Sequence, residues 1–183
     1  MESYTSNQDF MRCSDPYTPL PGLLVLHIRR GDFVEHCEHL ARWSSSFNAF
    51  NAYETLPDQW VTPPGGGNGE TSPENMKLYM RRCFPTIPQI VEKIQQVRQT
   101  PAGKGLKDIY VMTNGKKGWV GKLKRALSAT GGWEKIATSR DIVLTKEQKY
   151  IAQSVDMLIG QRAQVLIGNG GFHALSTEYK TAS

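Results

Sequence analysis

The chain has 183 residues and a formal net charge of +5, which is enough sequence for one domain with a sizeable apolar core. Its 39% hydrophobic and 21% charged residues are ordinary for a soluble globular protein. No apolar run approaches the ~20 residues that a membrane-spanning helix needs, and the N-terminus lacks the basic start and apolar run of a signal sequence. We therefore expect a soluble intracellular chain without a membrane segment, although a fragment of a longer secretory-pathway protein would look the same, so the compartment stays unknown.

Charge clustering and cysteine spacing give two weaker indications. Basic residues are densest between Lys116 and Arg125; on a helix this pattern most simply indicates a solvated face, and it favours nucleic-acid binding only weakly. The cysteines Cys13, Cys37 and Cys83 lack the CxxC spacing and histidine pairing of a zinc site. Their odd number argues against a complete disulfide framework and leaves one bridge open.

The N-terminal part predicts an extended lead-in followed by a buried strand. Residues 1–22 are polar and end in a proline-rich stretch, which disfavours a helix. The apolar run at residues 23–28 predicts a strand, and it passes into His27-Ile28-Arg29-Arg30-Gly31-Asp32. A parallel strand presents ligand-binding groups at its carboxyl end, and a guanidinium offers donors that fit phosphate oxygens. The residues therefore indicate an anion site, most simply for a phosphate.

Two other interpretations of this stretch remain beside the phosphate site. An arginine–aspartate pair after a strand is often only a surface or structural ion pair, and a single histidine such as His27 is more often structural. Arg30-Gly31-Asp32 also spells a cell-adhesion tripeptide. That function needs an exposed loop tip, whereas this tripeptide directly follows a predicted buried strand.

The rest of the chain predicts alternating helices and strands. Residues 33–56 are expected to form an irregular loop with one short helix, and the Gly/Pro-rich residues around 57–73 a flexible insertion. Ser72 can cap a short helix, and Thr145 with Gln148 can form a capping box. Further helices are predicted at residues 88–100, 119–130 and 145–160, and strands at 108–113, 142–144 and 163–167.

Such alternation predicts an α/β fold with a Rossmann-like, mostly parallel sheet and flanking helices. Three strand ends would then meet at one rim: His27–Asp32, Thr113–Gly115 and Gly168–Gly171. The Gly-rich third end would let backbone N–H groups approach an anion. A P-loop NTPase or a dehydrogenase is disfavoured, because the sequence contains neither GxxxxGK[ST] nor GxGxxG after a strand.

The stretch His27–Asp32 resembles the H-x-R-R-x-D motif of GDP-fucose-dependent fucosyltransferases, a group that includes α-1,6-fucosyltransferases and protein O-fucosyltransferases. Residues 41–45, 109–115 and 148–169 resemble fungal O-fucosyltransferase-like proteins, so the likeness runs from about Pro21 to Gly170. It implies the C-terminal, donor-binding half of a GT-B glycosyltransferase. Residues 23–170 would form this donor domain, and residues 171–183 a divergent tail.

The resemblance also implies roles for single residues in binding GDP-fucose. Arg29 would be the catalytic residue, because it would contact the diphosphate and stabilise the departing GDP. His27 would lie near guanine and ribose. Asp156 would accept hydrogen bonds from the guanine N–H groups, with an exposed charge on its helix as the alternative. Arg30 and Asp32 match the motif, either as a loop-shaping ion pair or as direct contacts.

The other two strand ends would complete this donor site. Asn114, after Thr113, matches a strand end that faces the nucleotide. Gly168, Asn169 and Gly170 occupy the place of the phosphate loop, where the Gly170 backbone and Ser176 are candidate substitutes for the hydroxyl that the family carries. No metal and no cofactor is expected beyond the donor substrate itself.

Two departures from the family leave three hypotheses open. The Phe-Ser-Ser type segment after the last strand is missing, and so is the family's N-terminal acceptor domain. The chain is therefore a fucosyltransferase acting on a protein or glycan hydroxyl, a non-catalytic or truncated nucleotide-sugar-binding module, or a basic phosphate- or RNA-binding domain. Asp32 and Glu35 are candidate general bases by location only, and we expect little or no turnover by the isolated chain.

Overall fold

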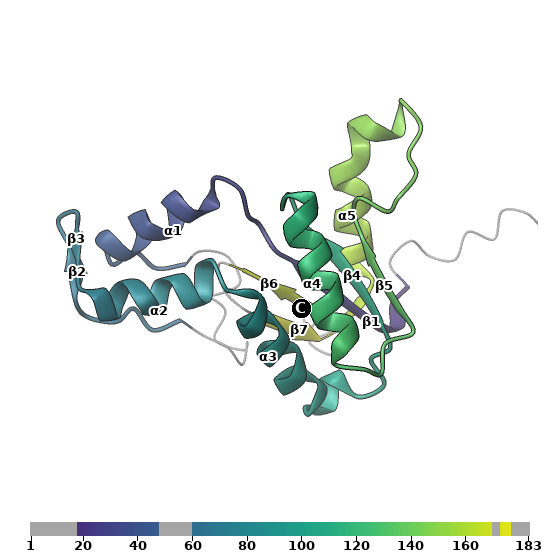
Figure 1. Ribbon diagram of the computed structural model, residues 1–183, viewed down its shortest axis with the longest axis horizontal. Coiled ribbons are helices and arrows are strands. Elements are labelled where there is room, and N and C mark those ends of the chain that lie inside the picture. Colours follow the sequence, from purple (N-terminus) through teal and green to yellow (C-terminus); the bar gives the residue numbers. More distant parts are fainter. Residues whose placement is uncertain (1–17, 48–59, 170–172, 177–183) are drawn as a thin grey trace, which may run out of the picture.

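A five-stranded sheet is the centre of the computed structural model, which describes residues 18–47, 60–169 and 173–176 (Figure 1). The spatial order of the strands is β5 (Lys135–Thr138), β4 (Asp108–Met112), β1 (Leu20–His27), β6 (Ala163–Gly168) and β7 (His173–Ser176). The first four strands run parallel, and β7 pairs antiparallel with β6. The mostly parallel α/β fold that the sequence predicts is thus confirmed. Residues 1–17, Gly170 and residues 177–183 lie outside the described residues.

The helices cover both faces of this sheet because the central strand β1 is apolar on both sides. Leu24, Leu26 and Ile28 pack against α3 (Ile87–Arg98) and α4 (Lys117–Ala129). The intervening residue Val25 belongs to the opposite face, where it joins a second cluster with Ile159 of α5 (Ala152–Gln161). Since side chains alternate along a strand, His27 lies on the α5 side.

A second, smaller core joins two helices outside the sheet. The helix α1 (Phe33–Arg42) packs against α2 (Pro73–Cys83), and a disulfide links Cys37 to Cys83. A short hairpin of β2 (Gly66–Gly67) and β3 (Glu70–Thr71) contacts α1. We call these elements the α1–α2 unit; it extends to the left of the sheet in Figure 1. The pairing resolves the question that the cysteine count left open for Cys37 and Cys83; Cys13 lies outside the described residues.

The hairpin occupies part of the segment that the sequence assigns to a flexible insertion. A Cβ on Gly66 would lie 2.8 Å from Asn75 Nδ2 and closer still to the Ala41 carbonyl oxygen, so only glycine fits this approach. The buried Asn75 donates to that same carbonyl oxygen at 3.0 Å. Ser72 caps α2 as predicted, because its hydroxyl accepts a hydrogen bond from the Asn75 backbone N–H.

Three local expectations need correction. The strand predicted at 142–144 is absent from this described segment, and the edge strand is instead β5, whose residues are mostly half-exposed. The chain after Gly168 returns as β7 within the region expected to be a divergent tail. Thr145 and Gln148 do exchange the hydrogen bonds of a capping box, but they precede a 3₁₀ turn, η4 (Gln148–Ile151), which leads into α5.

In the described part of the chain, no helix combines the length and apolarity needed to cross a bilayer.

Candidate functional site

An open pocket of about 590 Å³ lies where β1 and β4 end, on the α5 side of the sheet. The apolar part of its lining consists of Ile28, Met112 and Met157, and the polar part of His27, Arg29, Thr113, Asn114, Gln153 and Asp156. The register places His27 beside Met112 of β4 and Gly168 of β6. Parallel pairing therefore brings two of the three predicted strand ends into one pocket, together with one face of α5; we call it the strand-end pocket.

Arg29 lines this pocket, and its side chain is accessible. Its side chain is about half exposed, at 55%, and lies 4.0 Å from the carboxylate of the 78% exposed Asp32. The guanidinium also lies over the Phe33 ring of α1, 5.0 Å from the ring centroid. An exposed ion pair at this distance is weak. Arg29 can therefore exchange Asp32 for a ligand anion.

Arg30 points to a different part of the molecule. Its guanidinium lies between the Phe84 and Trp119 rings, 3.6 Å and 4.6 Å from their centroids, and donates to the Pro85 carbonyl oxygen at 2.8 Å. Burial lowers the pKa of this group, which nevertheless stays protonated. The described lining of the strand-end pocket includes neither Arg30 nor Asp32, and the ion pair of the motif joins Asp32 to Arg29. The Arg30 side chain thus makes structural contacts, while its contact with the nucleotide, one of two alternatives that the sequence leaves open, stays a prediction.

Asp156 is a half-buried acceptor and not an exposed charge. Tyr110 donates its hydroxyl hydrogen to one carboxylate oxygen at 2.6 Å, and Ser139 donates to the other at 2.9 Å. Burial, followed by the bond to Asp156, raises the pKa of Tyr110, so the phenol remains a donor. A carboxylate offers about four lone-pair positions. Each oxygen of Asp156 can therefore accept one further hydrogen bond from a ligand.

The sequence analysis missed Tyr110 and Ser139, the two residues that hold the Asp156 carboxylate. Tyr110 lies two positions before Met112 on β4, so strand alternation alone would have placed it on the pocket side of the sheet. Ser139 directly follows β5, a strand that the hydrophobic pattern did not indicate. Its position could not be read from the sequence for that reason.

The surroundings of His27 lower the pKa of its imidazole and so favour the neutral form. Desolvation by the surrounding protein lowers its pKa, the Asp156 carboxylate partly opposes this shift, and the Arg29 cation adds to it. A neutral imidazole carries one donor and one acceptor nitrogen. His27 can thus bind hydroxyl or base groups of a ligand without adding a charge.

Asn169 binds the main chain of the loop after β1. Its carboxamide exchanges two hydrogen bonds with the backbone of Arg29 and donates a third to the Cys83 carbonyl oxygen, each at 2.8 Å. On the other side of the loop, Asn114 Oδ1 accepts the Arg30 backbone N–H at 2.6 Å. The described lining of the strand-end pocket includes neither Asn169 nor Gly168, and Gly170 lies outside the described residues.

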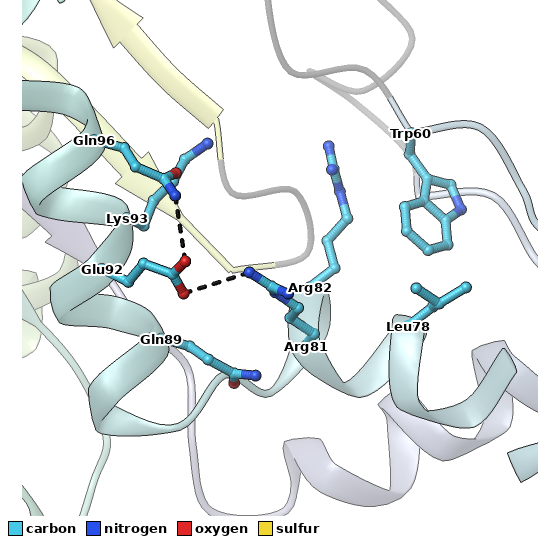
Figure 2. Close-up of a pocket in the computed structure, with 8 residues that line it drawn as sticks. All are labelled: Trp60, Leu78, Arg81, Arg82, Gln89, Glu92, Lys93 and Gln96. Atoms are coloured by element: carbon cyan, nitrogen blue, oxygen red, sulfur yellow. Dashed lines mark hydrogen bonds and ion pairs between the residues drawn. The ribbon is translucent and has the colours of Figure 1, made fainter. Parts of the chain in front are cut away.

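A second pocket of about 340 Å³ lies between α2 and α3 (Figure 2). Glu92 accepts hydrogen bonds there from Arg81 and Gln96, and the Arg82 guanidinium lies 5.3 Å from the Trp60 ring centroid. Figure 2 shows that the Arg81–Glu92 interaction joins α2 to α3, whereas Gln96 and Glu92 both belong to α3. This second pocket contains none of the residues at the strand ends. The strand-end pocket therefore remains the candidate site. No group of three or more potential metal-ligating side chains occurs among the described residues.

Comparison with known proteins gives structural likeness but no match in sequence. No family model matches the sequence, and no curated protein matches it. Among solved structures, the chain is similar to POFUT1, crystallised in complex with GDP-fucose, with a TM-score of 0.45 and 20% sequence identity. The alignment covers 85% of this chain and 36% of that one, so the chain spans about a third of the POFUT1 structure.

Proposed function

We propose that the strand-end pocket binds the nucleotide of GDP-fucose, and that the chain is the donor-binding half of a fucosyltransferase acting on a protein or glycan hydroxyl. The observation that supports this most directly is the meeting of Arg29 and Asp156 in one pocket of nucleotide-accommodating size. One group is a permanent cation and the other a half-buried carboxylate. The resemblance of His27–Asp32 to the fucosyltransferase motif supplies the identity of the sugar nucleotide.

The two ends of a guanosine diphosphate match the two charged groups. Guanine carries adjacent N1–H and amino donors, which suit the remaining acceptor positions of Asp156. The diphosphate carries negative charge, which suits Arg29. As the bond to fucose breaks, charge develops on the terminal phosphate, and a preorganised cation stabilises it. His27, between these groups, would contact the ribose or the base.

Calorimetry with GDP and ADP tests the assignment of the base. We expect GDP to bind more tightly, because adenine presents a different donor pattern to Asp156. The Asp156→Asn variant should lose most of this preference, since the amide replaces one acceptor by a donor. Equal binding of the two nucleotides, or binding of neither, would contradict the proposal. Binding of RNA with an affinity that ignores Asp156→Asn would favour a basic nucleic-acid-binding domain.

Replacing Arg29 tests the phosphate end. We expect Arg29→Ala to weaken GDP binding about 50-fold, because a charge-assisted contact is lost. Arg125→Ala is the matched control, since Arg125 is exposed on α4 and should leave the affinity unchanged. Turnover of GDP-fucose by the isolated chain is expected to be slight. Tight GDP binding with no turnover, even with the acceptor-binding half supplied, would favour a non-catalytic module.

A further inference from the structure

The loop that carries Arg29 is held by two carboxamides, one from each neighbouring strand end. Directly after β1, the Ile28 N–H still donates to a carbonyl oxygen of the neighbouring strand β4, that of Met112, at 2.9 Å. Beyond it, Arg29 donates its backbone N–H to Asn169 and Arg30 donates to Asn114. The two asparagines thus continue the pairing of β1 after the sheet itself has ended. The direction in which the Arg29 side chain leaves the main chain depends on this pairing.

Asn169 makes the more extensive of the two contacts. Its Oδ1 accepts the Arg29 backbone N–H, and its Nδ2 donates to the Arg29 carbonyl oxygen. Both main-chain polar groups of Arg29 are therefore hydrogen-bonded to Asn169. The second hydrogen of Nδ2 goes to the Cys83 carbonyl oxygen at the end of α2. Its own backbone N–H donates to the His27 carbonyl oxygen at 3.1 Å. One side chain therefore joins β6, the Arg29 loop and the α1–α2 unit.

The α1–α2 unit is linked to Arg29 directly through Phe33 and indirectly through Asn169. The carbonyl that Asn169 binds belongs to Cys83, whose sulfur is bonded to Cys37 of α1. The Phe33 ring under the guanidinium belongs to the first turn of the same helix α1. The main chain of Arg29 is thus fixed through α2 and its side chain through α1, and the disulfide holds these two helices together.

We propose that Asn169 is a positioning residue, which aims the Arg29 guanidinium at a bound diphosphate by tying the loop to α2. The inference rests on the proposed diphosphate site but assigns Asn169 a different role from direct binding. Loss of its carboxamide would leave the Arg29 charge in place but let the loop move. Misplacing a binding group by about an ångström is enough to lose most of its benefit.

The chain contains a matched control on β6, the strand that Asn169 directly follows. Gln164, at the other end of β6, accepts the Gly22 backbone N–H at 2.7 Å and donates to the Ala102 and Lys104 carbonyl oxygens at 2.9 Å each. These bonds include one accepted and two donated backbone hydrogen bonds, as those of the Asn169 carboxamide do. It lies at the amino-terminal end of β1, away from the strand-end pocket. Gln164→Ala and Asn169→Ala should therefore lower the melting temperature similarly.

Binding of GDP and of guanosine to the full chain separates positioning from stability. We expect Asn169→Ala to weaken GDP binding about tenfold while guanosine, which lacks the phosphates, binds within twofold of the unsubstituted chain. Gln164→Ala should leave both affinities within twofold. Adding Asn169→Ala to Arg29→Ala should cause no further loss, because Asn169 acts through Arg29. GDP binding unchanged in Asn169→Ala, or weakened equally in both alanine variants, would overturn the inference.

Amide hydrogen exchange distinguishes a failure of this inference from a failure of the proposed function. Exchange of the Arg29 amide should be faster in Asn169→Ala and unchanged in Gln164→Ala, whether or not GDP binds. Faster exchange in a chain that binds no GDP would refute the proposed function and leave the loop-positioning role supported. Unchanged exchange would refute the positioning role. If Asn169→Ala does not fold, Asn169→Ser, which retains one hydrogen-bonding group, should show the same changes at smaller size.

Discussion

The sheet with its flanking helices and the α1–α2 unit are stabilised in different ways. Apolar side chains fill both sides of the sheet, and Leu24, Leu26 and Val25 of β1 are fully buried. The α1–α2 unit has a smaller core and adds a disulfide between its two helices. Arg29 lies where the two regions meet. The register of the strands therefore determines which side chains line the pocket, whereas contacts with the α1–α2 unit fix the position of Arg29 in the loop after β1.

The largest effect is expected in the core of the sheet. Leu26→Ala removes a fully buried side chain from the centre of the largest cluster, which should cost about 4 kcal/mol of unfolding free energy. Urea denaturation followed by circular dichroism measures it. Val143→Ala is the control, because Val143 is 96% exposed and should change stability little. An equal loss in both variants would show that the described core is wrong.

Removing the disulfide should lower the free energy of unfolding by less than Leu26→Ala does, and its effect should be confined to the α1–α2 unit. The double variant Cys37→Ser/Cys83→Ser opens a link between residues 46 positions apart in the chain, for which about 3 kcal/mol is typical. Hydrogen exchange should accelerate in α1 and α2 and much less in β1 and β4, because the apolar core of the sheet remains. A uniform acceleration across all these elements would mean that the two regions unfold as one.

Arg30→Lys should lower the free energy of unfolding by about 1 kcal/mol, because Arg30 joins the sheet region to the α1–α2 unit. A lysine keeps the charge, but it loses the planar group that stacks between Phe84 of the α2 end and Trp119 of α4. Arg42→Lys, at an exposed position beside Glu38, is the control and should leave stability unchanged. The same denaturation experiment reads both variants. Equal stability of the two variants would show that the ring contacts of Arg30 do not stabilise the fold.

The smallest effect is a pH dependence from His27. Its pKa is lowered in the folded chain, mainly by desolvation. The stability linked to it is therefore complete above the unfolded pKa near 6.5 and declines as pH falls through the lower, folded value. Between pH 7.5 and 5.5 the melting temperature of the unsubstituted chain should fall more than that of His27→Gln. Asp141, whose carboxyl pKa is lowered from 3.8, stays ionised throughout this range. Parallel decreases would exclude His27 as the source.

Most of the sheet region could be predicted from the sequence, because burial leaves a periodic pattern. The strands β1, β4 and β6 and the helices α3, α4 and α5 all coincide with apolar runs or stripes. The edge strands β5 and β7 did not stand out; β5 has only one fully buried residue, Thr138. A strand at the edge of a sheet has neighbours on one side only, so its hydrophobic signal is weak.

Parts of the site could also be predicted, and the rest depends on distant contacts. Parallel strands imply that His27, Arg29 and Asn114 lie near one another, and the structure places them with Asp156 in the strand-end pocket. Their binding of a nucleotide stays a prediction. The side-chain direction of Arg30 could not be deduced, since Phe84 and Trp119 lie far along the chain. The same holds for Asn169, whose partners come from separate elements.

Two side-chain amides, that of Gln164 on β6 and that of Asn169 directly after it, also oppose a shift of β1 that would remove the pocket. Gln164 binds the chain near the beginning of β1, and Asn169 binds it just past the end. Sliding β1 by a single residue would exchange its two faces, turning His27 towards α3 and α4 and an apolar neighbour towards α5. Such a slip would have to break the contacts at both ends of the strand together. The two amides thus make a one-residue shift of β1 during folding unfavourable, and β1 is the strand whose shift would remove His27 from the strand-end pocket.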